Sequence, residues 1–188
     1  GDTSDQIGGR EVTVVGAPET VEGAVGDALK FAGAESLGFS SEGFPTGNVS
    51  VTWSAWVQRE VSSGSVEYIA SYGLWDCCGQ AFGVGTRMGD EENTVFMTQW
   101  GGGFDAFATA ISLGEWHHVA AVYDGDLQNS TVYIDGEVAA SVDLPESPNY
   151  IDTEPAAIGS NPVGAEYFEG LIDEVGLYSR ALSADDVQ

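Results

Sequence analysis

Short apolar and β-branched runs, separated by turn-forming residues, recur along the whole chain, and this spacing is typical of strands. Residues 49–58 alternate most clearly, with one predicted core face made of Val49, Val51, Trp53, Ala55 and Val57. On the opposite face Trp56 stands among polar neighbours. We expect its ring either to be covered by a loop or to be available to a ligand.

The segment from Gly114 to Val142 predicts three consecutive antiparallel strands. Asp135-Gly136 separates two of them and suits a type I′ turn, which needs positive φ at both central residues. The run over residues 116–123 is largely apolar on both faces. Such a strand belongs inside a two-layer sandwich, with one face in the core and the other partly covered.

Similar runs predict strands over residues 11–15, 33–39, 66–72, 82–86, 94–100, 156–159 and 170–178, with a further short strand at Phe31. Residues 16–26 read as turn-prone, and Ser183 is a candidate N-cap of a short closing turn of helix. The fold class is therefore all-β, an antiparallel β-sandwich. We expect residues 1–10 to be a linker or leader and residues 11–188 to be one domain.

The charge is strongly acidic, with 30 Asp and Glu residues against 5 Lys and Arg, a formal net charge of −25. Such a surface repels nucleic-acid phosphates and anionic lipid headgroups, so we expect no nucleic-acid partner. Because no long apolar run is present, we expect no membrane insertion either. The composition indicates a halophile protein; the alternative is an ordinary acidic extracellular domain.

Three aromatic residues lie on Gly-bearing loops near predicted strand ends: Trp75, Trp100 and Phe104. Binding residues often sit on loops held by a rigid scaffold. An exposed aromatic ring there can stack on the apolar face of a sugar. These rings, with Trp56, are the candidate ligand-binding residues; the alternative is that they close the ends of the sandwich.

The sequence also contains candidate sites of covalent modification, a cysteine pair and two N-glycosylation triplets. Cys77 and Cys78 are adjacent, and the choices are a vicinal disulfide, two inert thiols or an intermolecular bridge. Asn48 and Asn129 each begin an N-glycosylation acceptor triplet at a predicted strand edge.

The segments GEWHHVAAVYDG (residues 114–125) and VYIDGEVAAS (residues 132–141) resemble the core signature of laminin-G-like domains in the concanavalin A-like lectin/glucanase superfamily. Residues 26–33 and 168–183 resemble the first and last strands of that family. The resemblance implies a jelly-roll sandwich. It says less about function, because the superfamily includes lectins, adhesion modules, hydrolases and lyases.

The resemblance also implies a structural calcium ion (Ca²⁺) that joins the early strands to the last one. Carried over by position, its ligands are the side chain of Asp173, the carbonyl of Gly33 and, in addition, Glu35. The alternative is that Asp173 caps a loop by hydrogen bonds.

No strand carries the alternating carboxylates of the superfamily's glucanases, and His117 and His118 fall in the structural signature. No Ser-His-Asp elbow is apparent in the sequence. We therefore expect a non-catalytic, extracellular carbohydrate-binding or adhesion module whose partner is a glycan or a surface protein. The alternatives are a self-assembling subunit of a surface layer or filament, and a divergent polysaccharide hydrolase or lyase.

Overall fold

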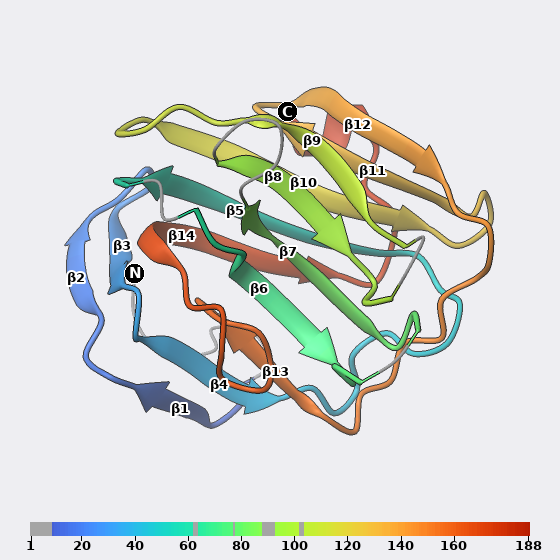
Figure 1. Cartoon of the computed structure of the whole chain (residues 1–188), viewed down its shortest axis with the longest axis horizontal. Coiled ribbons are helices and arrows are strands. Elements are labelled where there is room, and N and C mark those ends of the chain that lie inside the picture. The colour runs from blue at the N-terminus through green and yellow to red at the C-terminus, as the bar shows by residue number, and fades with distance from the viewer. Residues whose placement is uncertain (1–8, 62–63, 77, 88–92, 102–103) are drawn as a thin grey trace.

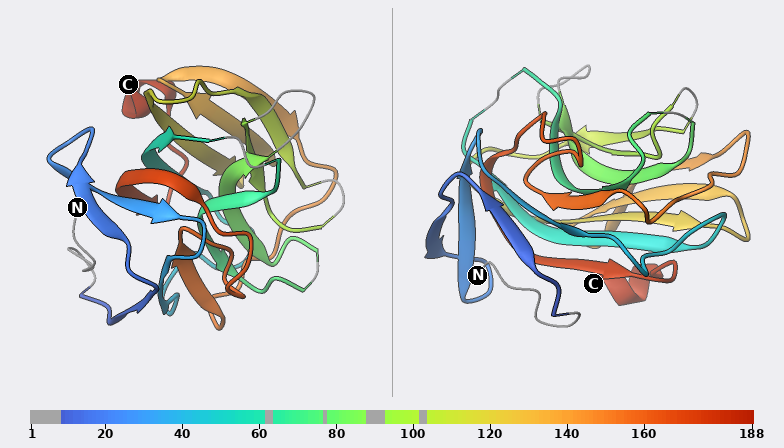
Figure 2. Two further views of the ribbon diagram at one scale, coloured as in Figure 1. Left: turned by 60° about the vertical axis from the view of Figure 1, so that its left-hand side comes forward. Right: turned by 90° about the horizontal axis from the view of Figure 1, so that it is seen from below.

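The computed structural model describes residues 9–61, 64–76, 78–87, 93–101 and 104–188. Over these residues the chain forms two antiparallel sheets of seven strands each, packed face to face as two layers (Figures 1 and 2). This arrangement confirms the predicted all-β sandwich. No helix within these ranges is long and apolar enough to span a membrane.

Sheet A has the strand order β1 (Val12–Val15), β4 (Ser36–Ser40), β13 (Pro155–Ile158), β6 (Glu67–Gly73), β7 (Ala81–Arg87), β8 (Thr94–Thr98) and β9 (Ala106–Ala110). Sheet B has the order β12 (Glu137–Asp143), β11 (Asn129–Ile134), β10 (Trp116–Asp124), β5 (Val51–Arg59), β14 (Glu169–Tyr178), β3 (Asp27–Ala32) and β2 (Glu19–Glu22). In each sheet, three of the six neighbouring pairs join strands that are not consecutive in sequence, among them β4–β13 and β5–β14, as expected for a jelly roll.

The core lies between the sheets and follows the period-two pattern. Val51, Trp53, Ala55 and Val57 of β5 are all buried, as predicted. Val49 is an exception, because it precedes the strand and is 40% exposed. The alternation therefore fixed the inward face, but it extended that face by one position too many.

Strand β10 occupies the interior of sheet B between β5 and β11. Val119 and Ala121 point into the core, and Ala120 and Val122 point outward. The outward residues are covered by the C-terminal segment, where Leu182 packs against them. The predicted turn is present, with φ of 52° at Asp135 and 81° at Gly136.

Strands β2 and β9 were not predicted. Strand β2 is a polar edge strand, ETVE, inside a segment that reads as turn-prone. Strand β9, AFATA, consists mostly of small residues after a glycine-rich loop. Strand β2 has only one apolar side chain in four residues and β9 has only one β-branched residue, so neither shows the apolar, β-branched run that identifies a strand from sequence alone.

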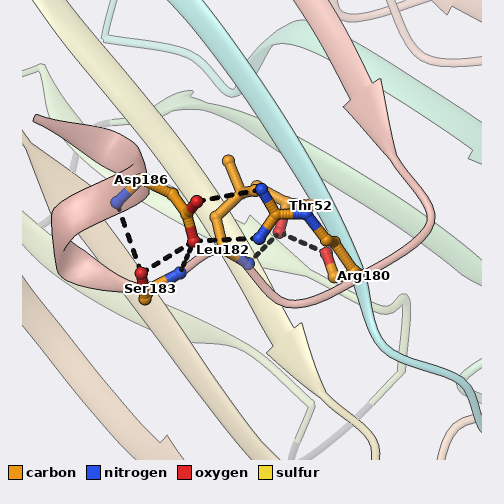
Figure 3. Close-up of polar contacts among 5 residues, drawn as sticks. All are labelled: Thr52, Arg180, Leu182, Ser183 and Asp186. Carbon is orange, nitrogen blue, oxygen red and sulfur yellow. Dashed lines mark hydrogen bonds and ion pairs between the residues drawn. The ribbon is translucent and has the colours of Figure 1, made fainter.

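The C-terminus is fastened to sheet B by polar contacts (Figure 3). Ser183 caps helix α1 (Ala184–Val187) in a capping box with Asp186, whose carboxylate also accepts two hydrogen bonds from Arg180, at 2.9 and 3.0 Å. The hydroxyl of Thr52 on β5 donates to the Arg180 carbonyl at 2.9 Å and accepts from the Leu182 amide at 3.1 Å. The Arg180 and Ser183 hydrogen bonds lower the pKa of Asp186 below its usual range.

A buried ion pair connects the two sheets. Arg59 of β5 binds Glu67 of β6, with only 2% and 4% of the two side chains exposed. Arg59 also donates to the Glu169 carbonyl at 2.8 Å, and the Glu169 amide donates to the Glu67 carboxylate at 2.9 Å. The guanidinium carbon lies 5.0 Å from the centroid of the Phe168 ring. Both charges are thus compensated inside the protein.

Candidate functional site

The candidate site is a pocket of about 420 Å³ on the outer face of sheet A. It is formed by β6, β7 and β8 with the β8–β9 and β13–β14 loops, and Figure 1 looks onto this layer. Its lining residues are Val66, Tyr68, Arg87, Phe96, Thr98, Trp100, Gly101, Asp105 and Glu166. Aromatic, hydroxyl and charged groups therefore meet in one cavity, a mixture typical of small-ligand sites.

Two glycines of β7 let the aromatic rings lie close to the sheet. A Cβ atom on Gly83 would stand 3.0 Å from the Trp75 ring and 3.1 Å from the Tyr68 ring. A Cβ on Gly85 would stand 3.0 Å from the Phe96 ring and even closer to the Glu67 carbonyl. The rings therefore pack directly on the backbone of β7, and side chains at these positions would push them away.

The rings support one another. Trp75 and Trp100 stack with centroids 5.0 Å apart and planes at 28°. Tyr68 meets Trp75 edge-on at 5.0 Å and Phe96 edge-on at 5.4 Å. Trp75 thus stands behind Trp100 and fixes the orientation of the ring that lines the pocket.

Two pocket residues have left-handed backbones, which are unusual for residues with a side chain: φ is 52° at Trp100 and 55° at Glu166. The surrounding contacts hold Trp100 there, because its amide donates to the Thr98 hydroxyl at 2.9 Å and its carbonyl accepts from the Gly79 amide at 2.7 Å. Backbone strain of this kind concentrates at functional sites.

Three charged side chains surround the Tyr68 ring. Burial, followed by the charges of Glu166 and Asp105, raises the pKa of Tyr68, and Arg87 opposes that rise. Burial also raises the pKa of Asp105, against a hydrogen bond from Thr98 and the charge of Arg87. The pocket thus holds two carboxylates and one guanidinium.

Of the ligand-binding residues predicted from sequence, the structure brings Trp75 and Trp100 together at this pocket. Phe104 is 6% exposed and belongs to the main core, as expected if its ring closes the end of the sandwich. Trp56 lies on sheet B beside His118, with ring centroids 5.4 Å apart. These two residues are therefore not part of the pocket.

Sequence reasoning missed Tyr68, Phe96, Arg87, Asp105 and Glu166. Tyr68 and Phe96 were placed on predicted strands, but the hydrophobic pattern did not show which face of the sheet carries a pocket. The available signal was the glycine alternation in β7, Gly83 and Gly85, because a strand without side chains on one face indicates a close approach by other groups.

The predicted calcium ligands do not converge. Ile172 pairs with Leu29, so Asp173 lies level with the start of β3, on the order of 15 Å from Gly33 at its far end. Both Asp173 oxygens accept backbone amides, from Val25 and Glu174, each at 2.9 Å. Glu35 instead accepts the amides of Ala32 and Ala34.

These contacts are those of the alternative, in which Asp173 caps a loop. Within the described ranges, no cluster of three or more His, Cys, Asp or Glu residues has the geometry of a metal site. The three residues therefore do not fit one ion. A calcium ion stays a prediction, which melting with and without a chelator would test.

The modification sites have different surroundings. Cys78 is disulfide-bonded, whereas Cys77 lies outside the described residues. Asn48 is exposed before β5, and its side-chain oxygen accepts from the Tyr123 hydroxyl. Asn129 is half-buried on β11, where its amide nitrogen donates to Asp143 at 2.9 Å. Glycosylation at either residue stays a prediction.

A Ser-His-Asp arrangement that the sequence did not reveal lies beside sheet B. Ser112 Oγ is 2.7 Å from His117 Nε2, and His117 Nδ1 is 2.8 Å from Asp135 Oδ2. The same sequence of contacts, Ser to His to Asp, occurs in serine hydrolases, in which the serine hydroxyl donates its proton to the imidazole. Here Ser112 donates to the Glu115 carboxylate at 2.6 Å. We interpret the group as a tie between the β9–β10 loop and the Asp135 turn.

Residues 31–188 match the laminin-G-type family model described as Concanavalin A-like lectin/glucanases superfamily. This match covers well over half of the chain. The chain belongs to this family. No curated protein matches the sequence.

Solved structures share the fold at low sequence identity. Domain 4 of an extracellular arabinanase from Geobacillus stearothermophilus, solved with arabinotriose, superposes with a TM-score of 0.76 at 20% identity, over 99% of this chain and 91% of that one. The binding domain of Paraclostridial Mosquitocidal Protein 1 superposes with a TM-score of 0.74 at 15% identity, over 98% of this chain and 48% of that one.

A botulinum neurotoxin type C structure, whose cell entry is described as dependent on two ganglioside molecules, gives a TM-score of 0.68 at 13% identity, over 95% of this chain and 45% of that one. This chain therefore spans about half the length of the two toxin structures. At these identities the likeness establishes the jelly-roll fold.

Proposed function

We propose that this protein is a non-catalytic carbohydrate-binding module and that its ligand site is the pocket on the outer face of sheet A. The observation that carries the proposal is the indole of Trp100, stacked on Trp75 at the wall of a cavity that also contains carboxylates and a hydroxyl. An aromatic face takes the apolar side of a sugar ring, and the polar groups take its hydroxyls.

The rigidity of the wall supports the proposal. The Trp100 ring is held from behind by Trp75, and its backbone is held by Thr98 and Gly79. A ring that is already ordered loses little conformational entropy when a ligand stacks on it. The indole is therefore preorganised to stack on one face of a ligand ring.

The comparisons support the same class of function. The similar structures include a domain solved with arabinotriose and a toxin structure associated with gangliosides. We infer from these that a glycan is the natural ligand class, and that the module acts outside the cell. The net charge of −25 further supports a saline environment.

The experiment is isothermal titration calorimetry with arabino-, xylo- and gluco-oligosaccharides in concentrated potassium chloride. Trp100→Ala should weaken binding at least about tenfold, roughly 1.4 kcal/mol. The matched control is Trp56→Ala, which removes the same side chain from sheet B and should leave affinity unchanged. Melting curves of both variants would establish that they are folded.

Two results would overturn the proposal. The first is the absence of binding across the panel. The second is equal weakening by the two substitutions, because this would place the ligand away from the pocket or show a general loss of structure.

A further inference from the structure

Two of the three charged side chains that line the pocket are hydrogen-bond acceptors. Asp105 and Glu166 are carboxylates and accept hydrogen bonds only. The buried Asp105 Oδ1 has no hydrogen-bond partner among the described residues. A ligand that donates hydrogen bonds would therefore complement these two carboxylates, whereas an anionic ligand would bring a like charge next to them.

The carboxylate of Glu166 is fixed in place. Asn161 donates to Glu166 Oε2 at 2.8 Å, and its own side-chain oxygen accepts the Ala165 amide at 2.9 Å, which shapes the loop. The Glu166 carbonyl accepts the Tyr68 amide at 3.0 Å. Since the loop holds this charge beside the Tyr68 ring, the carboxylate has little freedom to turn away from an incoming anion.

The pocket's cation is already engaged. The Arg87 guanidinium carbon lies 4.8 Å from the centroid of the Phe107 ring, and its charge acts on Asp105 and Tyr68. One guanidinium thus faces two carboxylates, on a chain whose net charge is −25. Both the local and the overall field oppose an anionic ligand.

We propose that this pocket selects uncharged, hydroxyl-rich sugar residues and rejects acidic ones such as uronic, sialic or sulfated sugars. The inference rests on the proposed function and adds the ligand class to it. Neutral sugar hydroxyls donate to Asp105 and Glu166 while the ring stacks on Trp100. An acidic sugar replaces a donor with a like charge next to the same carboxylates.

The test compares a neutral oligosaccharide that binds in the calorimetric panel with its acidic counterpart, in which primary alcohols are oxidised to carboxylates or, for a xylo-oligosaccharide without primary alcohols, a glucuronic acid substituent is attached. Concentrated potassium chloride screens the distant charges, so that the pocket dominates the difference. The acidic form should bind at least about tenfold more weakly to the unmodified protein. Equal or tighter binding of the acidic form would overturn the inference and leave the glycan-binding function standing.

Glu166→Gln should reduce the ratio of the affinities for the neutral and the acidic oligosaccharide several-fold. If Glu166→Gln does not fold, Asp105→Asn replaces it in the same comparison. The matched control is Glu137→Gln, which removes the same charge from an exposed position on β12 and should leave the ratio unchanged. If Glu137→Gln narrows the ratio as much as Glu166→Gln does, the discrimination comes from the overall charge and the inference is wrong. If neither oligosaccharide binds the unmodified protein, the proposed function itself fails.

Discussion

The indole rings of Trp75 and Trp100 stack with centroids 5.0 Å apart and planes at 28°, although 25 positions separate them in sequence. Trp75 follows β6 and Trp100 follows β8, and Gly83 of β7, which lies between those strands, leaves room for the Trp75 ring. Trp100 lines the pocket, whereas Trp75 is not among its lining residues. In the proposed glycan site, Trp100 is therefore the ring expected to contact the ligand, and Trp75 is the ring that holds Trp100 in its orientation.

Trp75→Ala should weaken glycan binding although Trp75 lines no part of the pocket, because Trp100 would lose the partner that orients it. The stacked indoles should also give an exciton couplet in circular dichroism, and the substitution should abolish it. Trp75→Phe, which retains an aromatic face, should restore part of the affinity. Full affinity in Trp75→Ala would contradict this positioning role.

Glu67→Gln should destabilise the protein by about 3–5 kcal/mol, because Arg59 would remain charged and buried without its counterion. The exposed pair Lys30–Glu60 supplies the control, since 35% and 43% of those side chains are exposed. Glu60→Gln should therefore have little effect. Denaturant unfolding of both variants checks the prediction, and similar midpoints for the two would refute it.

The C-terminal ion pair should contribute to stability in a pH-dependent way. The hydrogen bonds from Arg180 and Ser183 hold the folded pKa of Asp186 below its value in the unfolded chain. Its contribution is therefore fully present above that unfolded value, which is about 3.9, and is lost as the pH falls toward the lower folded pKa. Asp186→Asn should lower the melting temperature at about pH 7 and have a smaller effect near pH 2. An equal effect at both would indicate that the carboxylate charge is irrelevant.

Salt should stabilise the folded state. With a net charge of −25, folding brings carboxylates closer together than they are in the unfolded chain. Raising potassium chloride from about 0.01 M to 1 M shortens the Debye length from roughly 30 to 3 Å and screens this repulsion. The melting temperature should rise steeply over that range. A flat response would refute the halophile hypothesis and leave an ordinary acidic extracellular domain.

The sequence was informative where one residue type satisfies a local requirement. Asp135-Gly136 predicted a turn because few other pairs accept positive φ at both positions, and both residues have it. The β5 alternation predicted the inward set from Val51 to Val57 because burial follows the strand period. Both signals are local, so they did not depend on knowing the rest of the fold.

The site was less predictable because its residues are brought together by the order of the strands in sheet A, which the sequence pattern does not reveal. Tyr68 and Phe96 are neighbours because β7 lies between β6 and β8 and presents glycines to them. Asp105 and Glu166 enter from two loops far apart in sequence. A pattern read along the chain identified Trp75 and Trp100 as aromatic residues on loops, but it contained no information on which loops meet.

The most direct measurement is fluorine NMR of protein labelled with fluorotryptophan, titrated with an oligosaccharide that binds by calorimetry. The chain has five tryptophans, so each resonance can be assigned by single substitutions. We expect the Trp100 resonance to shift most, the Trp75 resonance to shift through the stack and the resonance of Trp56 on sheet B not to move. Shifts confined to Trp56, or an unmoved Trp100 at saturation, would contradict the claim that the sheet A pocket is the glycan site.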